Sequence, residues 1–326
     1  MPALPIQLVA VDVGGTHARF ALAEVAGGRV TALGPETVLR TADHAGLEMA
    51  WNAFAARVGQ PLPPAAAIAF AGPVGGDVLK LTNNSWIVRP AELPRAIGVE
   101  RLVIVNDFGA VAHAVAQLGP DQLVHLCGPD RALPAEGVIS VVGPGTGLGV
   151  AQLLRRDGRA FVIETEGGHA DFAPLDAFED RLLAHLRVQY GRVSVERLAA
   201  GMGLAHIYRL LCEIEACPPA YRDDASLWAA ALAGTDPIAG AALDRFCLIL
   251  GAAAGDIALV HGAGAVVIAG GLGLRLAEHL PRSGFRARFV AKGRYERMMA
   301  AMPVKLITHP QPGLFGAAAA FAARYA

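Results

Sequence analysis

The chain has 326 residues, of which 54% are hydrophobic and 17% are charged, and its formal net charge is −1. This length is long for one hydrophobic core, so we expect two α/β lobes, and the apolar content excludes a disordered chain. The near-neutral charge provides no basic surface for nucleic acid or for an anionic membrane, which favours small-molecule chemistry.

The sequence indicates a cytoplasmic protein without a membrane span. Two uncharged runs, at 137–154 and 257–274, approach spanning length, but clustered glycines interrupt both, and buried strand–turn segments explain them better. The N-terminus has no basic region before its apolar run, so we expect no signal peptide. Cys212 and Cys217 would suggest a metal pair, but no second pair completes a zinc site, and we expect reduced structural thiols.

The first part of the chain predicts a β-meander followed by alternating helices and strands. A short apolar run rich in β-branched residues ends in Gly14-Gly15-Thr16, and two further strands follow around another glycine turn. In chain order we expect strands at 7–13, 19–25 and 29–39, a helix at 47–58, strands at 65–71 and 102–105, and a helix at 108–117.

The second part repeats the strand–turn–strand arrangement. An apolar strand ends in a glycine-rich turn that contains Thr146, and another strand follows. We expect strands at 138–142, 150–154 and 161–164, helices at 175–190, 195–200 and 238–260, strands at 265–269 and 304–308, and a final helix at 314–325.

The two glycine turns are candidate phosphate-binding sites. Either turn alone is equally well explained as a tight hairpin without a ligand. Two turns, each following a buried strand and each carrying a threonine, favour an anion site, because successive backbone N–H groups can surround phosphate oxygens. Neither is a Walker A loop, since no Lys-Ser/Thr follows, and neither is a dinucleotide fingerprint, since a strand follows where a helix should begin. The residues expected to bind ATP are Gly14, Gly15, Thr16, Gly143, Gly145, Thr146 and Gly147.

Asp12 precedes the first turn and is the candidate metal ligand. Its carboxylate is expected to hold the Mg²⁺ that accompanies ATP, directly or through water.

Eight segments together resemble the bacterial glucokinase family over about residues 8 to 322. They are VDVGGTHARFAL, LTNNSW, VNDFGAVAHAV, GPGTGLGVA, EGGHADFAP, GRVSVERL, VIAGG and PGLFGAAAAF, in this order. The resemblance implies a two-lobe α/β fold of the actin-like superfold, with ribonuclease-H-like topology, a cleft between the lobes for ATP and sugar, and a homodimer. The small lobe is expected to cover 1–115 and the helix 312–326, and the large lobe 116–311.

Asn106 and Asp107 end a predicted strand, where functional groups gather in α/β sheets. Taken alone, the aspartate is better explained as a cap on the next helix. The resemblance implies that Asp107 is the general base that accepts the proton of the sugar 6-hydroxyl as that oxygen attacks the γ-phosphate. Asn106 is then expected to hydrogen-bond neighbouring hydroxyls.

The remaining sugar ligands are assigned by the resemblance. Glu166 and His169 lie on a glycine turn that alone would be a satisfied surface turn, with zinc ligation the other alternative for the histidine. Glu196 matches a third sugar carboxylate, although alone it resembles a solvated helix residue. Asn83, with Asn84, supports the sugar side, and Trp86 next to them is expected in the core.

The turn Gly270-Gly271 after the strand at 265–269 resembles the adenosine-side turn of the family. A tight strand-to-helix corner explains it nearly as well.

Three positions differ from the family pattern. His17 replaces an Asn, Ala200-Gly201-Met202-Gly203 replaces Ser-Gly-Pro-Gly, and His261-Gly262 replaces Gly-Thr. The last two replacements are places where ATP binding or sugar preference could differ from the family. The acid–base and sugar residues are intact, so the kinase interpretation stands.

The expected function is ATP-dependent phosphorylation of the 6-hydroxyl of glucose. The residue chemistry alone does not separate glucose from mannose or glucosamine, or ATP from polyphosphate. Two alternatives remain: a kinase for an anhydro or amino sugar, and a sugar-sensing protein that has lost turnover. A predicted strand that begins by Gln7 leaves no room for an N-terminal DNA-binding module, which disfavours the sensor.

Overall fold

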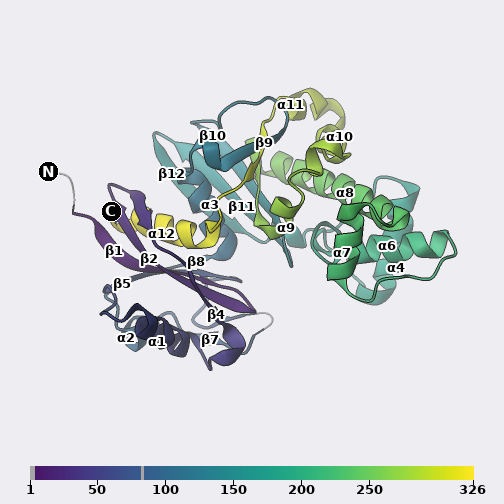
Figure 1. Ribbon diagram of the computed structural model, residues 1–326. Helices are drawn as coiled ribbons and strands as arrows, with labels where there is room; N and C mark the ends of the chain where they lie inside the picture. The colour runs from purple at the N-terminus through teal and green to yellow at the C-terminus, as the bar shows by residue number, and fades with distance from the viewer. Residues whose placement is uncertain (1–3, 82–83) are drawn as a thin grey trace. The chain divides into compact units, whose positions relative to one another are not determined.

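The computed structural model describes residues 4–81 and 84–326 and divides the chain into two compact units. Unit 1 comprises Met1–Gly119, Val162–Glu164 and His309–Ala326, and unit 2 comprises Pro120–Phe161 and Thr165–Thr308. The C-terminal helix α12 (Pro312–Tyr325) therefore packs with the N-terminal strands, and Figure 1 shows this yellow helix beside the purple strands of unit 1.

A mixed sheet with strand order β3-β2-β1-β5-β8 forms the centre of unit 1, and β4 also pairs with β2. Its strands are β1 (Ile6–Val13), β2 (His17–Ala26), β3 (Arg29–Leu33), β4 (Thr37–Arg40), β5 (Ala65–Phe70) and β8 (Arg101–Asn106). β1 is antiparallel to β2 and parallel to β5, and β5 is parallel to β8.

The single strand expected at 29–39 is wrong, because the chain forms two strands there. β3 pairs with residues 23–26 of β2, whereas β4 pairs with residues 17–20 of the same strand. The chain breaks between them at Gly34, whose N–H donates to Leu22 O (2.8 Å).

Helices cover both faces of the unit 1 sheet. Leu8 and Ala10 of β1 pack with α12, whereas Val9 and Val11 pack on the face that holds Trp51 of α1. Burial on both faces explains why β1 is a continuous apolar run rather than an alternating one. The helices are α1 (Leu47–Val58), α2 (Leu93–Ile97), α3 (Asp107–Gln117) and α12 (Pro312–Tyr325), and a small hairpin joins β6 (Leu79–Lys80) to β7 (Ile87–Val88).

Unit 2 repeats the plan of unit 1 with the order β12-β11-β10-β13-β14-β9. β10 is antiparallel to β11 and parallel to β13, as β1 is to β2 and β5. Each sheet thus has the ribonuclease-H-like order, and the strand–turn–strand pattern seen twice in the sequence occupies the equivalent strands. The strands are β9 (Leu123–Cys127), β10 (Gly137–Pro144), β11 (Leu148–Arg156), β12 (Arg159–Thr165), β13 (Ala263–Ile268) and β14 (Val304–Ile307).

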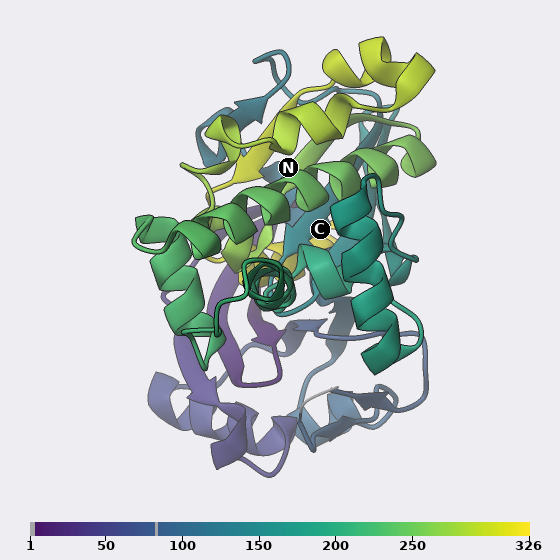
Figure 2. The same cartoon turned by 90° about the vertical axis from the view of Figure 1, so that its right-hand side faces the viewer.

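The long helix α8 forms much of the core of unit 2. Leu243, Phe246 and Leu250 on this helix are fully buried and pack with α6, α7 and α10. Figure 2 shows α8 as the long green helix of this unit. The helices are α4 (Ala177–Tyr190), α5 (Glu196–Ala199), α6 (Gly203–Ile214), α7 (Asp224–Ala233), α8 (Pro237–His261), α9 (Gly270–Arg275), α10 (Phe285–Val290) and α11 (Glu296–Ala300).

The structure confirms the expected α/β class and the core position of Trp86, which is 1% exposed.

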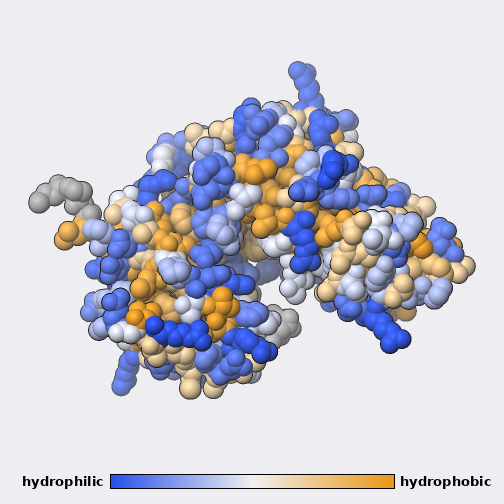
Figure 3. Space-filling view, in the orientation of Figure 1, coloured by the Kyte–Doolittle hydropathy of each residue, from blue (hydrophilic) through white to orange (hydrophobic). Residues whose placement is uncertain are grey.

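Within residues 4–81 and 84–326, no helix combines the length and apolar character needed to cross a membrane. On the face shown in Figure 3, hydrophilic and hydrophobic residues are interspersed. All four cysteines are free, and burial raises the pKa of Cys127 to about 11 and that of Cys247 to about 12.

Candidate active site

The first glycine turn (residues 14–16) joins β1 to β2 and is held in place by hydrogen bonds that its carbonyl oxygens accept. Gly15 O accepts hydrogen bonds from Thr41 Oγ1 (2.8 Å) and Asn84 Nδ2 (3.0 Å), and Thr16 O accepts one from Thr41 N (3.0 Å). These bonds fix the shape of the turn without a ligand. Asn84 therefore supports the turn, and Asn83, the candidate next to it, lies outside the described residues.

Asp12 is the second-last residue of β1, just before this turn. Burial raises the pKa of its carboxyl, and Arg19, whose Nη1 lies 3.6 Å from Oδ2, works against that rise. A Cβ on Gly313 would lie 2.6 Å from Oδ2, so a glycine is needed where the start of α12 meets the carboxylate. Because burial penalises its charge, this carboxylate gains from a nearby cation, which fits the expected Mg²⁺.

Asn106 and Asp107 form the junction between β8 and α3. Asn106 Oδ1 caps the helix by accepting from Phe108 N (2.8 Å) and Gly109 N (3.2 Å), and its Nδ2 donates to Gly72 O (3.1 Å). The capping role that the sequence offered as an alternative thus belongs to Asn106. Half-buried Asp107 follows as the first residue of the helix, and its Oδ1 accepts from Phe108 N (2.9 Å).

Glu164 is a further part of this junction. Its Oε1 accepts a hydrogen bond from Asn106 N (2.7 Å), and a Cβ on Gly109 would lie 2.4 Å from the same oxygen. β8 is the last strand of its sheet, so Glu164 satisfies an N–H that no neighbouring strand pairs. Sequence reasoning passed over Glu164, because it lies 58 residues from Asn106 in an apparently ordinary strand.

The second glycine turn (residues 143–147) joins β10 to β11 in unit 2. Gly145 N donates to Gly147 O (2.8 Å), which closes the turn. Gly270, at φ 79°, lies against it, since a Cβ there would be 2.6 Å from Pro144 O. The turn Gly270-Gly271 is a strand-to-helix corner between β13 and α9 that packs on the second glycine turn, so these candidate ATP residues lie together within unit 2.

The candidate sugar-binding loop (the sugar loop, residues 166–175) contains Glu166 and His169. Gly168 lies so close to β11 that a Cβ there would be 2.1 Å from Leu148 O. The loop then runs beside residues 192–196, with Phe172 N donating to Val193 O (3.0 Å) and with Val195 N donating to Ala170 O (2.8 Å). Gly168 of the EGGH motif therefore serves close packing against β11.

This packing brings His169 and Glu196 together. His169 Nε2 lies 4.0 Å from Glu196 Oε1, and Glu196 Oε2 accepts from Leu148 N (2.9 Å). Arg192 supports the pair, because its Nη2 donates to His169 O and its Nε lies 2.6 Å from Asp171 Oδ1. The imidazole and the carboxylate can donate to and accept from sugar hydroxyls. Exposed Glu166 begins the same loop.

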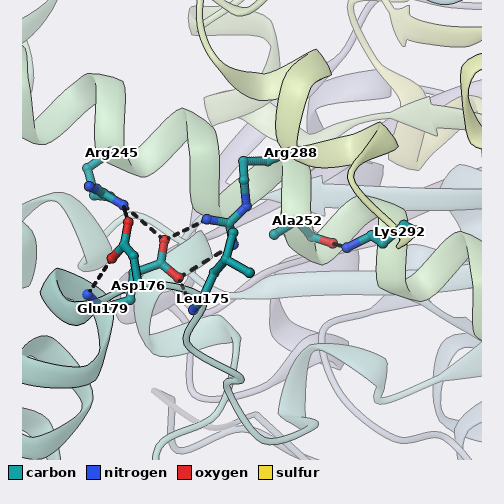
Figure 4. Close-up of polar contacts among 7 residues, drawn as sticks. All are labelled: Leu175, Asp176, Glu179, Arg245, Ala252, Arg288 and Lys292. Atoms are coloured by element: carbon teal, nitrogen blue, oxygen red, sulfur yellow. Dashed lines mark hydrogen bonds and ion pairs between the residues drawn. The ribbon is translucent and has the colours of Figure 1, made fainter. Parts of the chain in front are cut away.

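A buried ion network anchors the far end of the sugar loop (Figure 4). Glu179 is fully buried, and its Oε1 lies 3.3 Å from Arg245 Nη1 and 3.1 Å from Arg288 Nη1. Its Oε2 accepts from Leu175 N (2.9 Å), the last residue of the loop. Asp176 caps α4 through Glu179 N and pairs with Arg245. Glu179 was missed because a charged residue in a predicted helix resembles a solvated one.

One of the departures from the family pattern has a structural explanation. Gly262 ends α8 in the left-handed region at φ 62°, where glycine is favoured, and His261 Nδ1 lies 2.9 Å from Ser140 Oγ in β10. In the 200–203 segment, Gly201 N donates to Gly145 O (2.8 Å) in the second glycine turn. Nothing in the structure explains why His17 stands where the family has Asn.

Within the part of the chain that the structure describes, no group of three or more His, Cys, Asp or Glu side chains is arranged to hold a metal ion. Asp12 is a single carboxylate. It fits a cation whose other ligands are phosphate oxygens and water, as is usual for Mg²⁺.

Two comparisons of the sequence with known proteins agree on one family. A family model described as glucokinase matches residues 8–324. The glucokinase of Zymomonas mobilis is 62% identical over 320 residues, which are 98% of this chain and 99% of that protein.

Solved structures give the same result. The crystal structure of a glucokinase from an Antarctic psychrotroph superposes with a TM-score of 0.84 at 33% identity, covering 96% of this chain and 98% of that one. A ROK family glucokinase from Streptomyces griseus, solved in complex with glucose and AMPPNP, shares the fold with a TM-score of 0.61 at 21% identity, covering 96% of this chain and 98% of that one.

Proposed function

The chain belongs to the glucokinase family, and on that premise we propose that it transfers the γ-phosphoryl group of ATP to the 6-hydroxyl of glucose. The observation that carries the proposal lies within unit 2. A donor–acceptor pair suited to sugar hydroxyls, His169 and Glu196, lies 4.0 Å apart, and Glu196 also contacts a glycine turn suited to phosphates.

ATP is the phosphoryl donor, and each glycine turn carries groups suited to its phosphates. Their backbone N–H groups and the hydroxyls of Thr16 and Thr146 bind phosphate oxygens, and Gly270-Gly271 lies on the adenosine side. Asp12 holds Mg²⁺, directly or through water. When bound, Mg²⁺ neutralises charge on the phosphates.

Asp107 is the general base. It accepts the proton of the 6-hydroxyl as that oxygen bonds to the γ-phosphorus, while the bond from this phosphorus to the β–γ bridging oxygen breaks and ADP leaves. Asn106 fixes the base by its cap and by its bond to Gly72 O. Glu166, His169 and Glu196 bind the other hydroxyls, with Asn106 and Asn83 as further sugar contacts.

We also propose that the protein works in the cytoplasm as a homodimer. The cytoplasm supplies ATP and keeps the four free thiols reduced. The dimer rests on the family resemblance, and light scattering after size-exclusion chromatography tests it, with a mass of one chain contradicting the proposal.

A coupled ADP-release assay tests the reaction. With Mg-ATP, we expect glucose to give the highest kcat/KM among glucose, mannose and glucosamine. The matched control, 6-deoxyglucose, lacks only the acceptor oxygen and should give no ADP above the sugar-free rate. An equal rate with 6-deoxyglucose, or no acceleration by glucose, would contradict the proposal.

A further inference from the structure

One short segment of unit 2 holds both sides of the second glycine turn. Gly201 N donates to Gly145 O (2.8 Å) at the middle of the turn. Glu196, five residues earlier, accepts from Leu148 N (2.9 Å) where the turn leads into β11. The turn assigned to phosphate is thus braced by a carboxylate assigned to the sugar.

Gly147 is the point of closest approach between the turn and Glu196. A Cβ on Gly147 would lie 2.5 Å from Glu196 Oε2 and 3.3 Å from its Cδ. Gly145 differs, because a Cβ there would meet only Gly147 O, at 3.9 Å. Neither glycine is among the residues with positive φ, so the backbone conformation does not demand glycine at either position. At position 147 glycine is favoured because the Glu196 carboxylate occupies the space that a side chain would take.

The other oxygen of this carboxylate faces the sugar side. Glu196 Oε1 lies 4.0 Å from His169 Nε2, and the side chain is 22% exposed, so it remains accessible to a ligand. Displacing Oε2 would rotate the whole carboxylate, including Oε1. A side chain at position 147 would therefore disturb the sugar contact of Glu196.

We propose that Gly147 is a positioning residue for the sugar, acting through Glu196, although its sequence places it in a phosphate-binding turn. The inference rests on the proposed function, because the role of Glu196 as a sugar ligand comes from it. The inference gives the two glycines of one turn different roles: Gly145 serves the nucleotide, and Gly147 makes room for the carboxylate of Glu196, which binds the sugar.

The test compares Gly147→Ala with Gly145→Ala, measuring KM for glucose and for Mg-ATP in both variants. Gly147→Ala should raise KM for glucose about 10- to 100-fold, the scale of a misplaced binding group, and change KM for Mg-ATP less than about twofold. Gly145→Ala should show the opposite split, with the larger rise for Mg-ATP. Since the clash is with the end of a flexible side chain, both variants should fold, which equal thermal midpoints would establish.

A double-mutant cycle with Glu196→Asp tests whether Gly147 acts on sugar binding through Glu196. The shorter carboxylate withdraws from position 147, so Gly147→Ala should add less than about twofold to KM for glucose in that background. Fully additive effects would overturn the inference, as would a Gly147→Ala variant that raises only KM for Mg-ATP or neither constant.

Failure of the proposed function would be visible first in the unchanged protein, as glucose that does not accelerate ADP release. In that event the measured quantity is no longer KM. It is the glucose affinity, measured by calorimetry, of the unchanged protein and of the same variants. A larger loss of glucose affinity in Gly147→Ala than in Gly145→Ala would then support the inference, and an equal or smaller loss in Gly147→Ala would overturn it.

Discussion

The two units share a sheet plan but differ in one of the means that support their candidate site residues. In unit 1, the C-terminal helix adds close packing at glycines: Gly313 lies against the Asp12 carboxylate, and a Cβ on Gly316 would lie only 1.8 Å from Ala110 O. In unit 2, a buried ion network at Glu179 supports the sugar loop, and Glu196 accepts a hydrogen bond at the glycine turn.

The difference shows that topology and support are separate properties of a fold. The ribonuclease-H-like order brings strand ends to one edge of each sheet, and local sequence decides what holds them there. A site held by glycine packing is sensitive to added volume, whereas a site held by buried charge is sensitive to the loss of a partner. Three predictions follow this contrast from the largest effect to the smallest.

Glu179→Ala should have the largest effect on stability. It leaves Arg245 and Arg288 without their shared carboxylate, and breaking a buried ion pair by removing one partner costs about 3–5 kcal/mol of unfolding free energy. Urea unfolding measures this. Glu215→Ala, at an exposed position after α6, is the matched control and should stay within about 0.5 kcal/mol. Equal unfolding free energies of the two variants would show that the ion network of unit 2 does not stabilise the fold.

Acid should weaken both units through one histidine in each, buried His206 in unit 2 and half-buried His113 in unit 1. Burial, together with Arg209 and Arg197, lowers the pKa of His206 to about 4, and burial lowers the pKa of His113 to about 4. Between pH 6.5 and 4 the unfolded chain then binds more protons than the folded one, so stability is lost as the pH falls through this window.

The share of His206 in that loss is up to about 3 kcal/mol. Unfolding free energies measured from pH 7 to pH 4 should therefore fall less steeply for His206→Gln than for the unchanged protein. Parallel curves for the two proteins would contradict the assignment of a buried neutral imidazole in unit 2.

Gly316→Ala should destabilise unit 1 by about 1–3 kcal/mol, because its Cβ would meet the backbone of α3 and force the helices apart. Gly240→Ala is the matched control, since a Cβ at this helical glycine of α8 meets nothing within 4 Å. That variant should be about 0.5–1 kcal/mol more stable than the unchanged protein. A Gly316→Ala variant more stable than the unchanged protein would show that close packing at this glycine does not support unit 1.

Local sequence signals predicted much of the fold. The helix expected at 47–58 is observed as α1, since its apolar spacing and the left-handed Gly59 that ends it are both local. The missed helix α7 also had such signals, with Asp223 as its N-cap and left-handed Gly234 as its C-cap.

The supporting residues of the site could not be predicted in this way. Glu164 accepts from Asn106 across 58 residues of sequence, and Glu179 contacts Arg288 across 109. Only the folded chain shows which distant charged residues meet, since a carboxylate in a helix or strand resembles a solvated one. The roles of the glycines were likewise hidden, because the sequence does not say whether a glycine serves φ, a ligand or a neighbour such as Glu196.

The central claim is that Asp107 is the base for transfer to the sugar, and Asp107→Asn tests it most directly. The amide keeps the size and polarity of the side chain but cannot accept the proton. Calorimetric glucose affinity should stay within about threefold, while kcat for ADP release falls by about 10²–10⁴, the contribution typical of a general base. A variant that binds glucose and turns over at nearly the original kcat would contradict the account.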